Sequence, residues 1–204
     1  MNSSELFSDK IILASGSPRR KEILTAVGWP FEAITAGIDE TRRADEKPLD
    51  YVQRLAREKA EAVADKLESG LVLGADTTVV VGDELLEKPA ADDDARRMLQ
   101  LLSGKWHEVL TGVALVRVGG QTMVDYERTR VRFVEMSEAE IDWYVSTGEP
   151  KGKAGAYGIQ GKAALFIEQI EGDYFNIVGL PIRLVYEMSD KLRGSCKIRT
   201  QSSE

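Results

Sequence analysis

The chain is poor in the two residue types that most often build disulfides and zinc sites. Among its 204 residues there is one cysteine, Cys196, and one histidine, His107. One cysteine cannot form an internal disulfide or a cysteine-based metal site, and one histidine argues against a histidine-rich zinc centre and a Ser-His-Asp triad. We predict that His107, which follows a tryptophan within a strand pattern, is structural. Any general base is therefore expected to be a carboxylate or a lysine.

Excess positive charge and long apolar runs are also absent. Lysine and arginine together number 27 against 34 aspartates and glutamates, which gives a net charge of −7. Nonspecific binding to nucleic acid or to an anionic membrane needs a basic surface, so we predict neither partner, although a local basic pocket for a small anion stays compatible with this balance. No apolar run approaches transmembrane length, and the first ten residues lack a basic segment followed by an apolar one. We therefore predict a cytoplasmic protein.

The length and the even composition predict a single mixed α/β domain over residues 10–193. Residues 1–9 form an N-terminal lead, and the polar residues 194–204 are expected to be a disordered tail. The stretch LVLGADTTVVVGDELLEKP predicts a buried strand followed by a hairpin with a Gly-Asp turn. A capping box from Ser137 to Glu140 predicts a helix start. Periodicity predicts further strands at 10–14, 31–35, 106–118, 122–136 and 164–170, and helices at 18–27, 48–68, 92–102, 141–145 and 181–192.

The stretch LASGSPRR places small residues, a helix start and two arginines at one strand-to-helix corner. Ser17 has the character of an N-cap and Pro18 that of the first helical residue. Arg19 and Arg20 then lie in the first turn, where a cation opposes the helix dipole. A bound phosphate would offset that cost, because guanidinium groups hold phosphate oxygens in pairs. A solvated arginine pair is an equally good interpretation of the spacing alone, and the P-loop pattern is absent.

Two other stretches can carry chemistry. In GADTTVV, Asp76 interrupts an apolar strand, and a buried carboxylate is costly unless it is paired, bound to a metal or catalytic; the alternative is a strand-end cap. In GKAGAYGIQG, glycines surround Tyr157 and Gln160, which indicates a loop whose backbone approaches a ligand while one amide contacts it; the alternative is a plain surface loop. For several other charged residues, the local sequence predicts only a solvated surface position: Glu22, Asp39, Glu40, Glu58, Lys59 and Lys88.

Six stretches in order resemble the Maf family of nucleoside triphosphate pyrophosphatases: LASGSPRRKEIL, RLAREKAEAVA, GADTTVVVGDELLEKP, LSGKWHEVLTGVAL, GKAGAYGIQG and GDYFNIVGLPI. The resemblance runs from about residue 10 to residue 192. It implies an inosine-triphosphatase-like α/β fold, with a curved mixed sheet, flanking helices and a cleft between two lobes. It also implies hydrolysis of a nucleoside triphosphate to the monophosphate and pyrophosphate, a divalent metal cofactor and homodimerisation. The AYGIQG form resembles the subgroup that acts on dTTP and UTP rather than on 7-methyl-GTP.

The resemblance also implies roles for individual residues. Asp76 matches the proposed proton acceptor of the family. Three positions match those tied to substrate choice: Arg19, Thr77 and Gln160. The remaining polar positions of the cleft are matched by Ser15, Arg20, Glu22, Lys59 and Lys88.

Hydrolysis between the α- and β-phosphates needs the negative charge of the leaving pyrophosphate to be neutralised. The cations available for this are Arg19, Arg20, Lys59 and Lys88. A Mg²⁺ or Mn²⁺ ion would share this work, with Glu22 and Asp76 as its candidate ligands. The same two carboxylates are the candidates for the base, and the sequence does not separate the two roles.

Two other functions are compatible with parts of the sequence. One is a non-catalytic regulator of cell division that binds a nucleotide, a nucleic acid or a protein partner, against which the acidic composition argues. The other is a phosphatase, or a nucleotide-binding module, with a different choice of bond. The phosphate product released from dTTP distinguishes these possibilities.

Overall fold

The computed structural model describes residues 10–199, with side chains described as far as Gly194. The predicted lead and residues 200–204 of the predicted tail lie outside this range. The elements follow one another as β1 (Ile11–Leu13), α2 (Pro18–Ala26), β2 (Phe31–Ala33), α3 (Pro48–Ala64), β3 (Leu71–Val81), β4 (Glu84–Leu86), α4 (Asp92–Leu102), β5 (Trp106–Arg117), β6 (Thr122–Phe133), α5 (Glu138–Ser146), η1 (Ala154–Ala156), η2 (Lys162–Phe166), β7 (Ile167–Glu171), α6 (Tyr174–Val178) and α7 (Ile182–Arg199).

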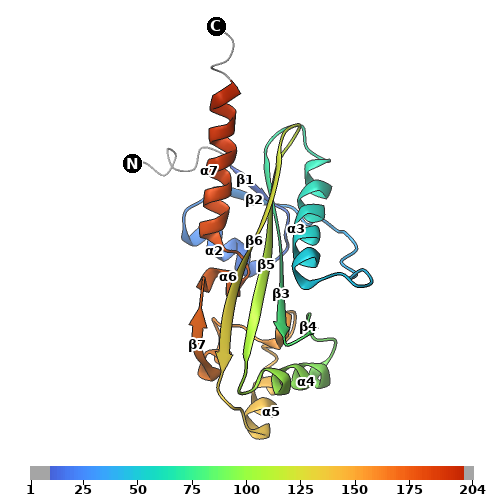
Figure 1. Cartoon of the computed structure of the whole chain (residues 1–204), viewed down its shortest axis with the longest axis vertical. Helices are drawn as coiled ribbons and strands as arrows, with labels where there is room; N and C mark the ends of the chain where they lie inside the picture. The colour runs from blue at the N-terminus through green and yellow to red at the C-terminus, as the bar shows by residue number, and fades with distance from the viewer. Residues whose placement is uncertain (1–9, 200–204) are drawn as a thin grey trace.

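The strands form one mixed sheet of seven strands in the order β2-β1-β3-β5-β6-β7, with β4 paired to β3. β1 is parallel to both β2 and β3, whereas the pairs β3–β4, β3–β5, β5–β6 and β6–β7 are antiparallel. The long strands β3, β5 and β6 run through most of the length of the molecule and form its spine (Figure 1). The turn between β3 and β4 has at Gly82 the positive φ, +58°, that the predicted Gly-Asp hairpin requires.

Apolar side chains gather in separate cores at the two ends of this spine. At one end, α4 and α5 pack with β4 and the ends of β3, β5 and β6 around Leu99, Phe133 and Tyr144. At the other end, α2 and α7 cover one face of the sheet around Leu24 and Leu73, and α3 covers the opposite face. Figure 1 shows α3 beside one end of the spine and α4 and α5 at the other. This is the predicted mixed α/β architecture with two lobes.

The approach of α3 to the sheet is unusually close, because glycines lie beneath it. A Cβ atom at Gly74 would lie 2.0 Å from the carbonyl oxygen of Ala56, and one at Gly112 would lie 2.2 Å from that of Val52. Real Cβ atoms do not approach this closely, so only glycine permits the contact. The contact brings Lys59 of α3 next to the strand that carries Asp76.

The predicted elements are present, with shifts of a few residues at several ends and four main differences. α3 ends at Ala64 rather than near residue 68, and α6 was not predicted. β7 begins at Ile167 rather than at 164, because residues 162–166 form a 3₁₀ helix that buries Ala163 and Phe166 in the core of α4 and α5. α7 continues to Arg199 rather than ending near 192, so the tail predicted to be disordered is helical over residues 194–199. No proline interrupts that polar stretch, and polar residues are compatible with a helix.

Among residues 10–199, no helix combines the length and the apolar character needed to cross a membrane.

Candidate active site

The sheet has a gap in its hydrogen bonding, and the main cavity opens at that gap. β1 pairs with residues 71–73 of β3, and β4 pairs with residues 79–81. Residues 74–78 therefore have β5 on one side and no strand on the other. A cavity of about 610 Å³ lies beside this free edge. Asp76 and Thr77 are thus presented to a cleft by a strand whose residues 71–80 all pair with β5.

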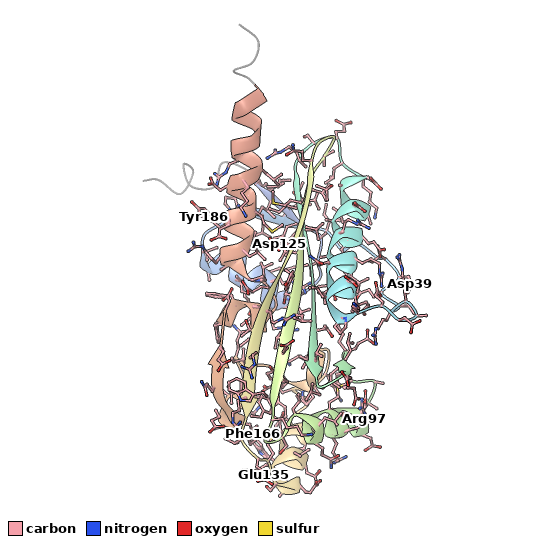
Figure 2. The ribbon with its side chains drawn as sticks, in the orientation of Figure 1. Asp39, Arg97, Asp125, Glu135, Phe166 and Tyr186 are labelled. Carbon is pink, nitrogen blue, oxygen red and sulfur yellow. The ribbon has the colours of Figure 1, made fainter. Side chains whose placement is uncertain are left out.

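The cleft is locally basic within an acidic protein. Its lining comes from the corner before α2, the loop after β2, α3, β3, the glycine-rich loop and the end of α6. Figure 2 shows Asp39, the neighbour of the lining residue Glu40, on the loop beside the start of α3. Among the described residues, the cationic groups that line it are Arg19, Arg20, Lys59, Lys88 and Lys153, and the anionic groups are Glu40, Asp76 and Glu149. A cavity with this surplus of cations suits a polyanion such as a triphosphate.

Asp76 and Lys59 form a nearly buried ion pair in this cleft. Nζ of Lys59 donates to Oδ1 of Asp76 at 2.7 Å, and the two side chains are 12% and 10% exposed for Asp76 and Lys59 respectively. Burial raises the pKa of Asp76, and the Lys59 ammonium opposes part of that rise. Oδ2 of Asp76 has no hydrogen-bond partner within the described part of the chain. Asp76 therefore offers one free carboxylate oxygen to the cleft.

Glu40 is a second carboxylate of the cleft, although its position in the sequence indicated only a surface acid. Its Oε1 lies 3.0 Å from Nζ of Lys59 and its Oε2 lies 4.0 Å from Nζ of Lys88. These cations lower its pKa, against the effect of partial burial. Tyr51 holds this loop, since its hydroxyl lies 3.0 Å from the Glu40 carbonyl oxygen. Only the tertiary structure brings residue 40 to a site formed by α3 and β3.

Arg20 is held rigidly at the floor of the cleft. Its Nε donates to the carbonyl oxygen of Gly179 at 2.8 Å, Nη1 donates to Oγ of Ser15 at 3.1 Å, and Nη2 donates to Oγ1 of Thr77 at 3.2 Å. A guanidinium has five N–H donors, so two remain for a ligand. Burial lowers the pKa of Arg20, which the charge of Asp76 partly counteracts. The arginine pair at the corner is therefore not simply solvated, since Arg20 is buried.

Arg19 and Gln160 have a different character, because both carry unused hydrogen-bonding groups. Each lines the cavity, and neither makes a hydrogen bond or an ion pair at 4 Å or less to another residue in the range the structure describes. Arg19 is half-buried, and burial lowers its pKa. Thr77 belongs with the fixed residues, since its Oγ1 accepts from Arg20 and lies 2.9 Å from Oγ1 of Thr111. Free donors and acceptors at the wall suit contacts to a ligand.

The structure therefore brings together eight of the nine predicted site residues: Ser15, Arg19, Arg20, Lys59, Asp76, Thr77, Lys88 and Gln160. Glu22 is the exception, because it is exposed and does not line the cavity. It lies two residues after Arg20 on α2, and two residues turn a helix by about 200°, which directs the two side chains to opposite faces. Glu40, rather than Glu22, is the carboxylate that lies with Asp76 beside the lysines of the cleft.

The oxygen donors of the cleft fit a divalent cation only in part. No group of three or more acidic, histidine or cysteine side chains suited to a metal occurs among the described residues. Asp76 and Glu40 nevertheless share Lys59 as a partner. Mg²⁺ is commonly bound by one or two carboxylates together with substrate phosphates. The donor set therefore suits a metal that arrives with a phosphorylated substrate.

His107 lies outside the main cavity. Its Nε2 lies 2.8 Å from the hydroxyl of Tyr157, and its ring packs edge-on against Phe133 at 5.1 Å between centroids. Burial lowers its pKa to about 3, so the ring is neutral near pH 7. The arrangement agrees with a structural role, in which His107 supports the Tyr157 end of the glycine-rich loop.

Comparison with known proteins agrees with the fold and with the resemblance to the Maf family. The family model described as Maf-like protein matches residues 10–192. A dTTP/UTP pyrophosphatase of Bacillus cereus (strain B4264) is 53% identical over 180 residues, covering 88% of this chain and 94% of that protein. One of Bacillus anthracis (strain CDC 684 / NRRL 3495) is 54% identical with the same coverage.

Among solved structures, the Ham1 protein of Staphylococcus aureus superposes with a TM-score of 0.51 at 13% identity, covering 89% of this chain and 98% of that one. This likeness concerns the fold, and it confirms the predicted α/β class. The family match spans nearly the whole described chain, including the residues that line the cleft. The chain belongs to the Maf-like protein family.

Proposed function

We propose that this protein hydrolyses dTTP and UTP to the monophosphate and pyrophosphate. The observation that carries the proposal is the basic cleft at the gap in the sheet, with Asp76 and its free oxygen beside Lys59 and Arg20. The similarity to dTTP/UTP pyrophosphatases supports the choice of substrate. Neither a phosphatase nor a non-catalytic regulator explains as well why a carboxylate is held among several cations.

The cations act on the phosphates. Arg20 is fixed by three hydrogen bonds, so its two remaining donors are aimed before the substrate arrives. Lys59 and Lys88 add charge from α3 and from the segment after β4. Positive charge placed where the leaving pyrophosphate develops negative charge lowers the barrier without reorganisation. The unpaired N–H groups at the start of α2 give the phosphates a further contact.

Asp76 is the proposed general base. Its Oδ2 faces the cleft without a partner, while Oδ1 is fixed by Lys59. A carboxylate held in this way can take a proton from a water aimed at the α-phosphorus. Burial raises the pKa of Asp76, and the contact with Lys59 favours the ionised carboxylate against this rise.

Nucleotide pyrophosphatases of this kind generally depend on a divalent metal. Mg²⁺ or Mn²⁺ would be held by Asp76 and Glu40 together with phosphate oxygens, and Glu40 replaces Glu22 in this proposal because it lines the cleft. When bound, such an ion supplies charge neutralisation on the triphosphate.

Gln160 is proposed to contact the base. Its amide can accept from N3–H and donate to a carbonyl oxygen of thymine or uracil. A purine edge does not offer these groups in the same place, and an unpaired buried polar group costs about 1–3 kcal/mol. Arg19 and Thr77 line the same cleft and complete the proposed specificity set.

The decisive experiment identifies the phosphate product. Purified protein is incubated with dTTP and Mg²⁺, and the products are resolved by anion-exchange chromatography, with UTP, CTP, GTP and 7-methyl-GTP tested in parallel. We expect dTMP with pyrophosphate, and faster turnover of dTTP and UTP than of the other nucleotides. Orthophosphate would identify a phosphatase, binding without turnover would identify a regulator, and faster turnover of 7-methyl-GTP would contradict the subgroup.

Three further proposals concern the domain organisation, the oligomeric state and the location of the protein. We propose that residues 10–193 act as one catalytic domain, that the protein is a homodimer, and that it works in the cytoplasm without a nucleic-acid or membrane partner. Light scattering coupled to size-exclusion chromatography tests the dimer, for which a mass near twice 22.6 kDa is expected.

A further inference from the structure

Gln160 depends on its backbone for its position. The side chain is exposed to the cleft and makes no hydrogen bond to the part of the chain that the structure describes. Its place is therefore set by the turn that carries it, in which the N–H of Gly161 donates to the carbonyl oxygen of Gly158 at 3.1 Å. A small shift of this turn would move the amide relative to the base, and a misplacement of about 1 Å can cost a large factor in rate.

Two side chains hold this turn, the buried Tyr144 and the half-buried Glu149. Oε1 of Glu149 accepts from the hydroxyl of Tyr144 at 2.9 Å, and Oε2 accepts from the N–H of Lys162 at 3.0 Å. The same Tyr144 hydroxyl accepts from the N–H of Gly158 at 3.3 Å. The backbone is thus tied two residues before Gln160 and two residues after it. Tyr144 itself is fully buried in the core of α4 and α5, so the attachment is rigid.

The glycines on either side of Gln160 make room for this attachment. A Cβ atom at Gly161 would lie 2.2 Å from Oε1 of Glu149, and one at Gly158 would lie 2.8 Å from Cε of Lys153. The Lys153 ammonium in turn donates to the carbonyl oxygen of Glu149. These glycines were expected to let the backbone approach a ligand. In the structure they let side chains of the protein itself approach the turn.

We infer that Tyr144, Glu149 and Lys153 form a polar brace that positions Gln160, and that Glu149 is a positioning residue for the choice of nucleobase. The inference rests on the proposed function, because it concerns how the base is selected. Glu149 holds the turn directly through Oε2, which accepts from the Lys162 N–H, and indirectly through Oε1, which accepts from the Tyr144 hydroxyl. An uncharged amide has only one accepting oxygen for these two positions. In Glu149→Gln, an N–H₂ group replaces one of the two accepting oxygens, so it either opposes the Lys162 N–H or forces the Tyr144 hydroxyl to accept where it now donates.

The test compares discrimination rather than activity alone. Glu149→Gln and Tyr144→Phe are measured for kcat/KM with dTTP and with GTP. The matched controls are Glu187→Gln and Tyr186→Phe on α7, which lie outside the cleft lining. We expect the dTTP:GTP ratio to fall about tenfold or more for Glu149→Gln and less for Tyr144→Phe. The controls should keep the wild-type ratio.

A double-mutant cycle separates positioning from general destabilisation. In a Gln160→Ala background, Glu149→Gln should leave the already reduced ratio unchanged, because the group that it positions is gone. Gly161→Ala, which would displace the Glu149 carboxylate, is a second variant if Glu149→Gln fails to fold, and it should lower the ratio in the same way.

An unchanged dTTP:GTP ratio in a folded Glu149→Gln or Gly161→Ala variant would overturn the inference. So would an equal fall of the ratio in the Gln160→Ala background. Failure of the proposed function is a distinct result, since the wild-type protein itself would then show no preference for dTTP.

Discussion

At the scale of single residues, the Lys59–Asp76 pair is better suited to catalysis than to stability. Both side chains are nearly buried, and removing two charges from water can cost as much as their attraction returns. A triphosphate would offer Lys59 a further anionic partner besides Asp76 and Glu40. The pair therefore places a cation and a base in contact before the substrate binds.

The first prediction concerns Asp76. Asp76→Asn keeps the shape and still accepts from Lys59, so folding should persist. Turnover of dTTP should fall about 100-fold or more, the range expected for loss of a general base. Steady-state kinetics measure the turnover of dTTP, and circular dichroism checks that the variant is folded. Near wild-type turnover in a folded variant would remove Asp76 from the chemistry.

The second prediction uses the pH profile. Burial raises the pKa of Asp76 and Lys59 lowers it, so Lys59→Gln should raise the pKa further. Since the base acts only when ionised, the acid limb of kcat/KM should move to higher pH in this variant. Lys88→Gln is the matched control, because the Lys88 side chain is 67% exposed and contacts Glu40 rather than Asp76. A limb that stays in place would show that the profile reports another group.

The third prediction separates the two arginines. Arg20 is fixed by Ser15, Thr77 and Gly179, and Arg20→Ala should lower kcat/KM for dTTP, UTP and CTP by similar factors. Arg19 has unused donors, and Arg19→Ala should instead change the ratios among these substrates. Arg20→Lys should rescue only in part, because an ammonium cannot reproduce the planar fork. Wild-type kinetics in all three variants would mean that neither arginine contacts the substrate.

At the scale of elements, the catalytic pair depends on how closely α3 lies on the sheet. Gly112 is the cross-strand neighbour of Asp76, and Val52 of α3 lies directly over it. Lys59 is two helical turns further along α3. The glycines of β3 and β5 therefore set the distance between the lysine and the carboxylate.

The fourth prediction tests this dependence. Gly112→Ala would place a Cβ atom 2.2 Å from the Val52 carbonyl oxygen, so backbone must move. Overpacking of this kind typically costs about 1–3 kcal/mol, and dTTP turnover should fall with it as Lys59 moves from Asp76. Gly194→Ala on α7 is the control, since nothing lies within 4 Å of its Cβ position, and it should be neutral or slightly stabilising. Equal urea midpoints for the two variants would contradict the account.

At the scale of the whole molecule, a buried neutral histidine makes the free energy of unfolding depend on pH. Burial lowers the pKa of His107 to about 3 from its ordinary 6.5. As the pH falls below about 6.5, the unfolded chain binds a proton that the folded chain does not. The free energy of unfolding therefore decreases over this window, by up to about 1.4 kcal/mol per pH unit.

The fifth prediction follows from this coupling. His107→Gln removes the titration and keeps a polar group near Tyr157. Urea unfolding between pH 7 and pH 4.5 should show a shallower loss of stability for the variant than for the wild type. The carboxylates titrate alike in both proteins and cancel in the difference. Parallel curves would show that His107 binds a proton in the folded state as readily as in the unfolded one.

The sequence alone determined much of this protein, because local patterns carry the information. Alternation and periodicity predicted the long strands and most helices, and a carboxylate within an apolar strand pointed to Asp76. The capping box at Ser137 is present as predicted, since a cap depends on residues three apart. The resemblance to the Maf family supplied the fold class and eight of the residues that line the cleft.

Which distant groups meet depends on how the elements pack. Glu40 joins Lys59 because a loop folds back over α3, whereas Glu22 turns away because of the angle between residues on a helix. The glycines around Gln160 face Glu149 and Lys153, a contact between loop and helix end that no spacing reveals. Short-range patterns fix the elements, but contacts between residues far apart in sequence depend on how those elements pack.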